Sequence, residues 1–327
     1  MRICVLGAGA SGGHFAYRLA QAGHDISVVA RGAHLAAIRE GGLRFVSGDE
    51  TGTASVAASD DPADLGPQDA VIVGVKATGL AAAVPLLEPL VGAHTAVLFP
   101  QNGMPWWYPV GEDLPHPLPD LPVFRHGEGF LRYLRPAQIL GGMIYTGNEV
   151  REPGLIFNSS PGRNLVTIGE LIPEGTEAAQ RLLDAFDGTG VEASRPANLR
   201  AAMWRKLLQN MSGSAIGLAT CNPSSISRDD PRLAEVYSRI VLEGNAIAAA
   251  WNYPLDIDPA EVMAKIPENH RPSLLQDYEC ERPMEIGEIV LAPAAFARAA
   301  GVPCPSLDTV AAIVARLAID RKLYDDA

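Results

Sequence analysis

Short apolar runs alternate with helical patterns through the first part of the chain. An apolar run at residues 3–6 leads into a glycine-rich turn, and residues 14–22 show a helical pattern that ends at a glycine. A second run at 26–30 follows at about the spacing of a βαβ crossover. Further runs at 71–75 and 95–99 each end in a polar or glycine-containing tip. This order predicts a parallel sheet whose ligands bind beyond the carboxyl ends of its strands.

The pattern changes twice farther along the chain. Residues 104–139 are irregular and rich in proline, as in an insertion, whereas 142–145 and 165–168 are candidate strands of the same sheet. Beyond residue 195 the chain carries only helical patterns. We therefore predict an α/β Rossmann-type N-terminal domain at 1–195 and an all-α C-terminal domain at 196–327. The predicted helices of the second domain cover 198–211, 232–251, 259–265, 283–300 and 306–320.

Composition narrows the class of protein. The 327 residues are 47% hydrophobic and 20% charged, which is typical of a soluble globular protein of about two domains. No apolar run reaches the length of about 18 residues that spans a membrane, and the four cysteines, none in a CxxC pair, predict neither a metal site nor a disulfide framework. Lys and Arg number 26 against 38 Asp and Glu, so the net charge of −12 argues against nucleic acid as a partner. The N-terminal run lacks the pattern of a signal peptide, and we expect a cytoplasmic protein.

The turn after the first strand has the sequence GAGASG. Gly7 permits a tight turn, Gly9 lets the backbone approach a pyrophosphate, and Gly12 lets the following helix pack closely on the strand. The N-terminal amides of that helix would face the anion. The motif is weak alone, but between a strand and a helix it predicts a dinucleotide site at Gly7, Ala8, Gly9, Ala10, Ser11 and Gly12. The alternative is a strand-to-helix turn without a ligand.

The tip of the second strand decides between two cofactors. An NAD site places Asp or Glu there for the ribose hydroxyls, whereas this chain has Ala30-Arg31-Gly32. The planar guanidinium of Arg31 suits a 2′-phosphate. NADP(H) is therefore the predicted cofactor, unless Arg31 is simply an exposed loop residue.

Other motifs are distributed in order along both predicted domains. They are Val75-Lys76, Gln101-Asn102-Gly103, Trp204-Arg205-Lys206-Leu207 with Asn210, Ser273-Leu274-Leu275-Gln276-Asp277, Glu285-Ile286 and Gly301-Val302-Pro303. Together with the glycine turn and Arg31, these segments resemble the ketopantoate reductase (2-dehydropantoate 2-reductase) family. The resemblance covers both halves of the chain and not only a shared nucleotide-binding fold.

The resemblance implies an enzyme of pantothenate biosynthesis that passes a hydride from NADPH to the keto carbon of a small 2-oxo acid, in a cleft between two domains. It implies that Lys206 delivers a proton to the carbonyl oxygen and that Glu285 supports the site. Lys76 and Asn102 would lie by the cofactor and substrate. Asn210 and Ser273 would hold the substrate, together with Ser214 where the family usually has a second asparagine. The assembly is left open, with a homodimer as one expectation.

The proposed role of Lys206 also has a chemical reason. Hydride transfer leaves negative charge on the ketone oxygen, which requires an aimed cation or proton donor. On a helix, Lys206, Asn210 and Ser214 lie at i, i+4 and i+8, so they would share one face and complement a carboxylate next to a carbonyl. The alternative is a solvated polar face with no substrate.

Other assignments have structural alternatives as well. Ser273 begins a Ser-Leu-Leu-Gln stretch with the form of a capping box, which would commit its hydroxyl to a helix N-terminus. Glu285 follows Pro283 and could be a first-turn carboxylate that the helix dipole favours. Lys76 and Asn102 could be ordinary turn residues.

Departures from the family pattern leave the substrate open. Ser214 replaces an asparagine and Val290-Leu291 replaces an Asn-Gly pair, so two amide contacts are lost. The insertion brings the aromatic residues 106–108 either over the substrate or into a small cluster beneath a loop. His14 in the first helix is assigned to the core or to the surroundings of the cofactor. Two further interpretations remain, another β-hydroxyacid-type dehydrogenase and a non-catalytic NADPH-sensing regulator.

Overall fold

The chain divides into two units, and the first of them is not continuous in sequence. The structure, a computed structural model, describes residues 1–325. The first unit contains residues 1–101 and 126–199, and the second contains residues 102–125 and the chain from 200 onward. The single boundary predicted at 195 kept residues 102–125 in the first domain. They group with the second unit, where the ring of Tyr108 packs against Trp204 and Phe296.

The first unit is built on an eight-stranded sheet in the order β12-β11-β8-β7-β6-β1-β2-β5. Neighbouring strands are parallel except β8 and β11, which are antiparallel. The strands predicted from the apolar runs are present, and those at 142–145 and 165–168 do join this sheet. The strands are β1 (Arg2–Leu6), β2 (Asp25–Val29), β5 (Ala57–Ser59), β6 (Gln68–Val73), β7 (Val91–Phe99), β8 (Ile139–Tyr145), β11 (Leu165–Glu170) and β12 (Glu192–Ser194).

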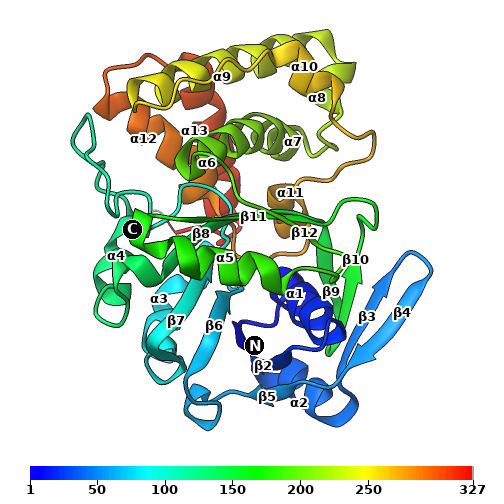
Figure 1. The fold of residues 1–327 in the computed structure, drawn as a ribbon. Coiled ribbons are helices and arrows are strands. Elements are labelled where there is room, and N and C mark those ends of the chain that lie inside the picture. Colours follow the sequence, from blue (N-terminus) through cyan, green and yellow to red (C-terminus); the bar gives the residue numbers. More distant parts are fainter. Residues whose placement is uncertain (326–327) are drawn as a thin grey trace. The chain divides into compact units, whose positions relative to one another are not determined.

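A second sheet of four strands packs on helix α1 (Ala10–Gln21), on the side that faces away from the eight-stranded sheet. Its order is β4 (Glu50–Ala54), β3 (Leu43–Ser47), β10 (Leu155–Asn158) and β9 (Asn148–Glu152). Helix α1 contacts strands of both sheets (Figure 1). Its buried side chains belong to one hydrophobic core with residues such as Phe45 and Ile156. The α/β Rossmann-type fold predicted for the N-terminal half is confirmed.

The remaining helices of the first unit surround the large sheet. They are α2 (Gly32–Gly41), α3 (Leu80–Leu87) and α5 (Thr176–Ala185), with 3-10 turns at η1 (Pro62–Asp64), η2 (Ala77–Gly79), η3 (Glu88–Leu90), η4 (Pro136–Gln138) and η5 (Pro173–Gly175). Helix α4 (Pro122–Phe130) carries the chain from the second unit back to the first.

The second unit contains only helices and loops among the described residues, as predicted. Two predicted helices differ in detail. The helix expected at 198–211 is α6 (Leu199–Gln209) followed by the π-helical turn η6 (Asn210–Ser214), and the helix expected at 283–300 contains the π-helical turn η7 (Gly287–Leu291) before α12 (Ala292–Ala299). The other helices are α7 (Ala215–Thr220), α8 (Ile226–Asp229), α9 (Pro231–Ala250), α10 (Pro259–Ala264), α11 (Ser273–Glu279) and α13 (Pro305–Asp320).

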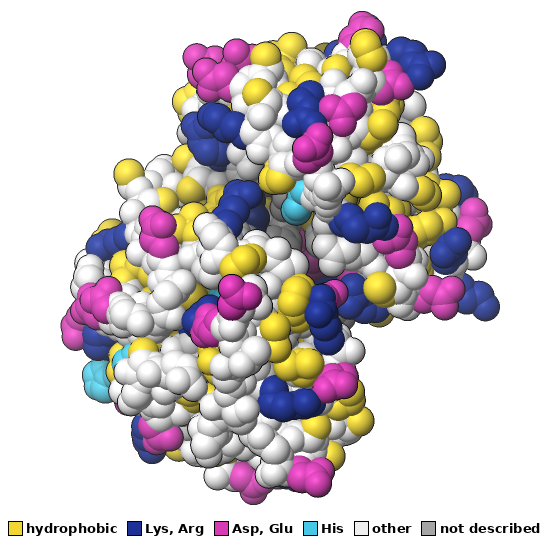
Figure 2. Space-filling model, turned by 90° about the vertical axis from the view of Figure 1, so that its right-hand side faces the viewer, with side chains coloured by type: hydrophobic (Ala, Val, Ile, Leu, Met, Phe, Trp, Pro, Cys, Tyr) yellow, Lys and Arg dark blue, Asp and Glu magenta, His cyan; other side chains and the backbone are white. Residues whose placement is uncertain are grey.

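Charges of both signs are mixed on the surface. On the face in Figure 2, Lys and Arg side chains alternate with Asp and Glu side chains, and neither sign forms one broad patch. Within residues 1–325, no helix combines the length and apolar character that spanning a bilayer requires.

Candidate active site

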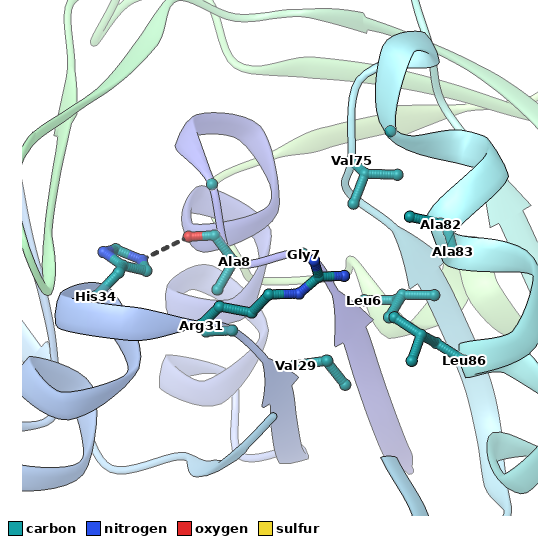
Figure 3. Close-up of a pocket in the computed structure, with 13 residues that line it drawn as sticks. Leu6, Gly7, Ala8, Val29, Arg31, His34, Val75, Ala82, Ala83 and Leu86 are labelled. Carbon is teal, nitrogen blue, oxygen red and sulfur yellow. Dashed lines mark hydrogen bonds between the residues drawn. The ribbon is translucent and has the colours of Figure 1, made fainter. Parts of the chain in front are cut away.

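A cavity of about 300 Å³ opens in the first unit at the carboxyl ends of β1 and β2. This is the place where an open α/β sheet binds its ligands. Figure 3 shows the cavity between the glycine turn, helix α2 and helix α3. It is lined by Leu6, Gly7, Ala8, Gly9, Val29, Ala30, Arg31, His34, Val75, Gly79, Ala82, Ala83 and Leu86.

Glycine occurs at positions 7, 9 and 12 of the turn for different physical reasons. Gly7 has φ +97°, and a Cβ there would lie 2.6 Å from Val75 Cγ1, so both conformation and packing require glycine. A Cβ on Gly12 would lie 2.0 Å from the Gly7 carbonyl oxygen. Gly9, in contrast, has φ −67° and open space around its Cβ position. The protein itself does not require glycine at position 9, which fits a ligand that approaches the backbone closely.

The N-terminus of α1 is open to an anion. Gly9 is its N-cap, no side chain caps it, and no acidic residue occupies its first turn. The first N–H groups of a helix have no intrahelical partner and favour negative charge. Ala10, Ser11 and Gly12 form this first turn, while Gly7, Ala8 and Gly9 line the cavity. The arrangement therefore fits the pyrophosphate of a dinucleotide.

Arg31 supplies a free cation at this cavity. Its side chain is exposed, lines the cavity in Figure 3, and makes no hydrogen bond or ion pair within residues 1–325. No acidic side chain lines the cavity. Lys76, also predicted at the cofactor, is exposed before η2 and is not part of the lining.

Two polar side chains hold the walls of this cavity. The amide of Gln101 donates hydrogen bonds to the carbonyl oxygens of Val73, at 2.7 Å, and Val75, at 3.0 Å, which ties the strand tip to the end of β7. His34 contacts the carbonyl oxygen of Ala8 at 2.7 Å. His34 is not among the site residues predicted from the sequence. Its spacing of three residues from Arg31 could have indicated that both side chains point to the same cavity, because residues at i and i+3 share a face of a helix.

The second unit brings together two residues that the sequence analysis assigned separately. Lys206 on α6 is buried, and its Nζ donates a hydrogen bond to Oδ1 of Asn102 at 2.7 Å. Asn102 is the first residue of the segment that groups with this unit. The Lys206 ammonium group is therefore held in one direction by its hydrogen bond, unlike the mobile ammonium group of a solvated surface lysine.

Two carboxyl groups lie near the start of η7. Glu285 is buried and immediately precedes the helical residues, which agrees with the expected helix N-terminus. The pKa of Glu288 is raised to about 7, mainly because burial disfavours its charged form and secondarily because of the negative charge of Glu285. Glu288 also contacts the segment after Asn102, because its carbonyl oxygen accepts from Met104 N at 2.8 Å and a Cβ on Gly103 would lie 2.6 Å from its Cβ. Glu288 is not among the site residues predicted from the sequence, although its i+3 spacing from Glu285 is visible there.

The predicted substrate residues lie on neighbouring elements of the second unit. Asn210 and Ser214 are the first and last residues of η6, which contacts both α11 and η7. The uninterrupted α-helical face predicted for 206–214 was wrong, because the backbone changes to π-helical geometry at Asn210. Ser273 is the first residue of α11, and its exposed hydroxyl makes no capping hydrogen bond. The capping-box interpretation of Ser273 is therefore not observed.

The remaining candidates belong to the cores of the two units. Trp106, Trp107 and Tyr108 are at most 1% exposed, and the Tyr108 ring packs against Trp204, Trp251, Tyr253 and Phe296. This favours the packing alternative for the insertion. Val290 is fully buried. His14 is also fully buried, and burial lowers its pKa to about 3, so it is neutral and belongs to the core.

Comparisons with known proteins show the family of the chain. The family models described as "Ketopantoate reductase PanE/ApbA" and "Ketopantoate reductase PanE/ApbA C terminal" match residues 3–171 and 198–318. The chain belongs to the ketopantoate reductase family. A 2-dehydropantoate 2-reductase of Mesorhizobium japonicum is 35% identical over 99% of this chain and all of that protein, and one of Pyrococcus abyssi is 26% identical over 93% of this chain and 94% of its own length. Within this family the chain is an oxidoreductase.

Solved structures share the fold over nearly the full length. The crystal structure of "a putative ketopantoate reductase from Ralstonia solanacearum MolK2" is 31% identical with a TM-score of 0.87, and the similarity covers 99% of both chains. A ternary structure of D-mandelate dehydrogenase with NADH and anilino(oxo)acetate is 21% identical with a TM-score of 0.84, covering 99% of this chain and all of that one. At this lower identity the similarity concerns the fold.

Proposed function

We propose that this chain reduces a small 2-oxo acid with NADPH, either 2-dehydropantoate to pantoate or a related 2-oxo acid. The main support for this proposal is the buried Lys206, whose Nζ donates a hydrogen bond to Oδ1 of Asn102 at 2.7 Å. The adjacent π-helical turn carries the amide of Asn210 and the hydroxyl of Ser214. Relatives that match nearly the whole chain are named 2-dehydropantoate 2-reductase, which supports the same reaction class.

The first unit provides the residues for the cofactor. The N–H groups at the start of α1 would bind the pyrophosphate, and the free guanidinium of Arg31 would bind the 2′-phosphate that distinguishes NADPH from NADH. When bound, the nicotinamide supplies a hydride to the keto carbon. The absence of an acidic side chain from the cavity lining supports NADPH over NADH.

The second unit provides the groups for the substrate. As negative charge develops on the carbonyl oxygen, Lys206 stabilises it and delivers the proton from Nζ. Asn102 orients Nζ through its amide oxygen. Asn210, Ser214 and Ser273 would donate hydrogen bonds to the carboxylate of the substrate, and the negative charge of Glu285 would support the ammonium form of Lys206.

The test is oxidation of NADPH, followed at steady state with a panel of 2-oxo acids of increasing size that includes 2-dehydropantoate. We expect turnover with at least one 2-oxo acid and a lower KM for NADPH than for NADH. Binding of NADPH without turnover of any acid would favour a sensing regulator. Turnover that does not depend on Lys206 would favour a different β-hydroxyacid-type dehydrogenase.

Assembly, pathway and location complete the proposal. A reductase of this kind would act in pantothenate biosynthesis in the cytoplasm, with a homodimer as the proposed assembly and no nucleic-acid or membrane partner. Light scattering coupled to size-exclusion chromatography measures the assembly, with 34.6 kDa expected for a single chain.

A further inference from the structure

His34 joins three separate parts of the first unit. It lies on α2, its Nε2 is 2.7 Å from the carbonyl oxygen of Ala8 in the glycine turn, and its Nδ1 is 3.0 Å from the backbone nitrogen of Gly154 in the β9–β10 turn. A carbonyl oxygen only accepts and a backbone N–H only donates. Nε2 must therefore carry the proton and Nδ1 must be bare, so the contacts define one neutral tautomer.

Among the described residues, the peptide between Ala8 and Gly9 has His34 as its one hydrogen-bond partner. Among residues 1–325, the Gly9 N–H makes no hydrogen bond, and the contact with His34 is the hydrogen bond that holds the Ala8 carbonyl. The flanking bonds, Ala8 N to Val29 O at 3.3 Å and Gly13 N to Gly9 O at 2.6 Å, belong to the neighbouring peptides. The plane of this one peptide therefore depends on His34.

That plane decides where the Gly9 N–H points. A trans peptide is planar, and its N–H points opposite to its C=O. In Figure 3 the Ala8 carbonyl points to His34, away from Val75, Ala82 and Leu86 on the other side of the cavity. The Gly9 N–H is consequently directed toward that side, beside the open space at the Gly9 Cβ position. A donor aimed in advance binds an anion with less reorganisation.

We propose that His34 is a positioning residue for the dinucleotide, which fixes the Ala8–Gly9 peptide so that the Gly9 N–H is ready to donate to a phosphate oxygen. The inference rests on the proposed use of NADPH. Neither Arg31 nor the glycines of the turn fix the orientation of the Ala8–Gly9 peptide, so His34 would supply this function. The Gly154 contact holds the imidazole, and the Ala8 contact transmits its position to the loop.

A matched pair of variants separates the two hydrogen bonds. In His34→Gln the amide nitrogen reaches the position of Nε2, so the bond to Ala8 is retained and that to Gly154 is lost. In His34→Asn the amide oxygen reaches the position of Nδ1, so the bond to Gly154 is retained and that to Ala8 is lost. Each variant loses one neutral hydrogen bond, and we expect similar losses of thermal stability from the two.

Fluorescence titration with NADPH measures the effect on the cofactor. We expect His34→Asn to raise the Kd about three- to tenfold, as the loss of one hydrogen bond predicts, and His34→Gln to stay within about twofold of the unaltered protein. His24, whose Nε2 contacts Ala185 O outside the cavity, is the control, and His24→Asn should leave the Kd unchanged. Equal Kd values for His34→Asn, His34→Gln and the unaltered protein would overturn the inference, as would a Kd that follows thermal stability in both variants.

Imidazole ¹⁵N NMR on the protein without ligand gives an independent measurement. We expect the His34 signal to show a protonated Nε2 and a bare Nδ1 at pH 7.5, and the opposite tautomer would also overturn the inference. Failure of the unaltered protein to bind NADPH at all would instead refute the cofactor assignment on which the inference rests. The two failures are therefore distinguishable.

Discussion

Lys206 and Asn102 are 104 positions apart in the sequence, yet Nζ of the lysine donates to Oδ1 of the asparagine at 2.7 Å within one compact unit. The contact exists because residues 102–125 leave the first unit and pack on the helices of the second. Asn102 therefore arrives beside the proposed proton donor through the packing of the whole segment.

Removing the ammonium group should abolish most of the turnover. A general acid typically contributes about 10²–10⁴-fold, so we expect Lys206→Ala to lower kcat by that factor while the Kd for NADPH stays nearly unchanged. Lys206→Arg should not restore activity, because a guanidinium does not release its proton near neutral pH. The neighbouring exposed Arg205 provides the control, and Arg205→Ala should retain near-normal kcat. Near-normal turnover by Lys206→Ala would contradict its assignment as the proton donor.

Cofactor preference should depend on Arg31. Its guanidinium is free to bind a 2′-phosphate, and charge-assisted hydrogen bonds are worth about 1.5–3 kcal/mol. We expect Arg31→Ala to raise the KM for NADPH roughly tenfold or more and to leave that for NADH nearly unchanged. Arg39→Ala, on the helix that follows Arg31, is the control, because the Arg39 side chain contacts Asp60 and the carbonyl oxygen of Ala58. Equal KM values for NADPH and NADH in the unaltered protein would contradict the assignment of Arg31 to the 2′-phosphate.

Gly9 and Gly12 should respond in opposite ways to the same substitution. Open space surrounds the Cβ position of Gly9, so Gly9→Ala should leave the free energy of unfolding nearly unchanged but weaken NADPH binding. Gly12→Ala would place a Cβ 2.0 Å from a carbonyl oxygen and should destabilise the fold itself. Urea denaturation and cofactor titration of both variants check this pair. Tight NADPH binding by Gly9→Ala would mean that no ligand approaches this glycine.

Glu288 should make the stability of the protein depend on pH. Its pKa is about 7 in the folded protein against an ordinary value of 4.5, so the folded state holds the proton more tightly. This tighter proton binding stabilises the fold fully below about pH 4.5. As the pH rises through 7 that contribution is lost, and the free energy of unfolding falls by about 3 kcal/mol in total. Between pH 5.5 and pH 8, the free energy of unfolding of the unaltered protein should therefore fall by about 2 kcal/mol relative to that of Glu288→Gln. Urea denaturation at both pH values measures this difference, and exposed Glu268→Gln should show none.

The segment that carries Asn102 should depend on one buried arginine. Arg200 is 6% exposed, donates to the carbonyl oxygens of Tyr108 and Val110, and pairs with Glu112 at 3.1 Å. Glu112 also accepts from the Tyr253 hydroxyl at 2.6 Å. We expect Arg200→Ala to lower the free energy of unfolding by about 3 kcal/mol, because breaking a buried pair leaves its partners unsatisfied.

An exposed ion pair gives the matched comparison for Arg200. Arg239 pairs with Glu235 one turn away on α9, with both side chains more than half exposed. Arg239→Ala should cost less than about 1 kcal/mol. If both arginine variants lose similar stability in urea denaturation, the 102–125 segment is held by its aromatic packing and not by Arg200.

Local patterns in the sequence were enough to predict the α/β half, the helical half and the glycine turn. Apolar runs, helical spacing and glycine positions act over a few residues, and the structure confirmed each of these elements. The family resemblance also held, because its motifs are short and their order along the chain is visible in the sequence. The proposed roles of the individual site residues remain predictions.

Long-range packing decided what these patterns did not contain. The transfer of residues 102–125 to the second unit, the π-helical turns at 210–214 and 287–291, and the contact of His34 with Ala8 all depend on neighbours distant in sequence. Burial likewise raised the pKa of Glu288, because the carboxyl loses water only when other elements pack over it. The sequence alone thus determined which elements form and which chemical groups they carry. Only the tertiary structure decided which groups touch, since hydrogen bonds and desolvation act between atoms a few ångströms apart, whatever their separation along the chain.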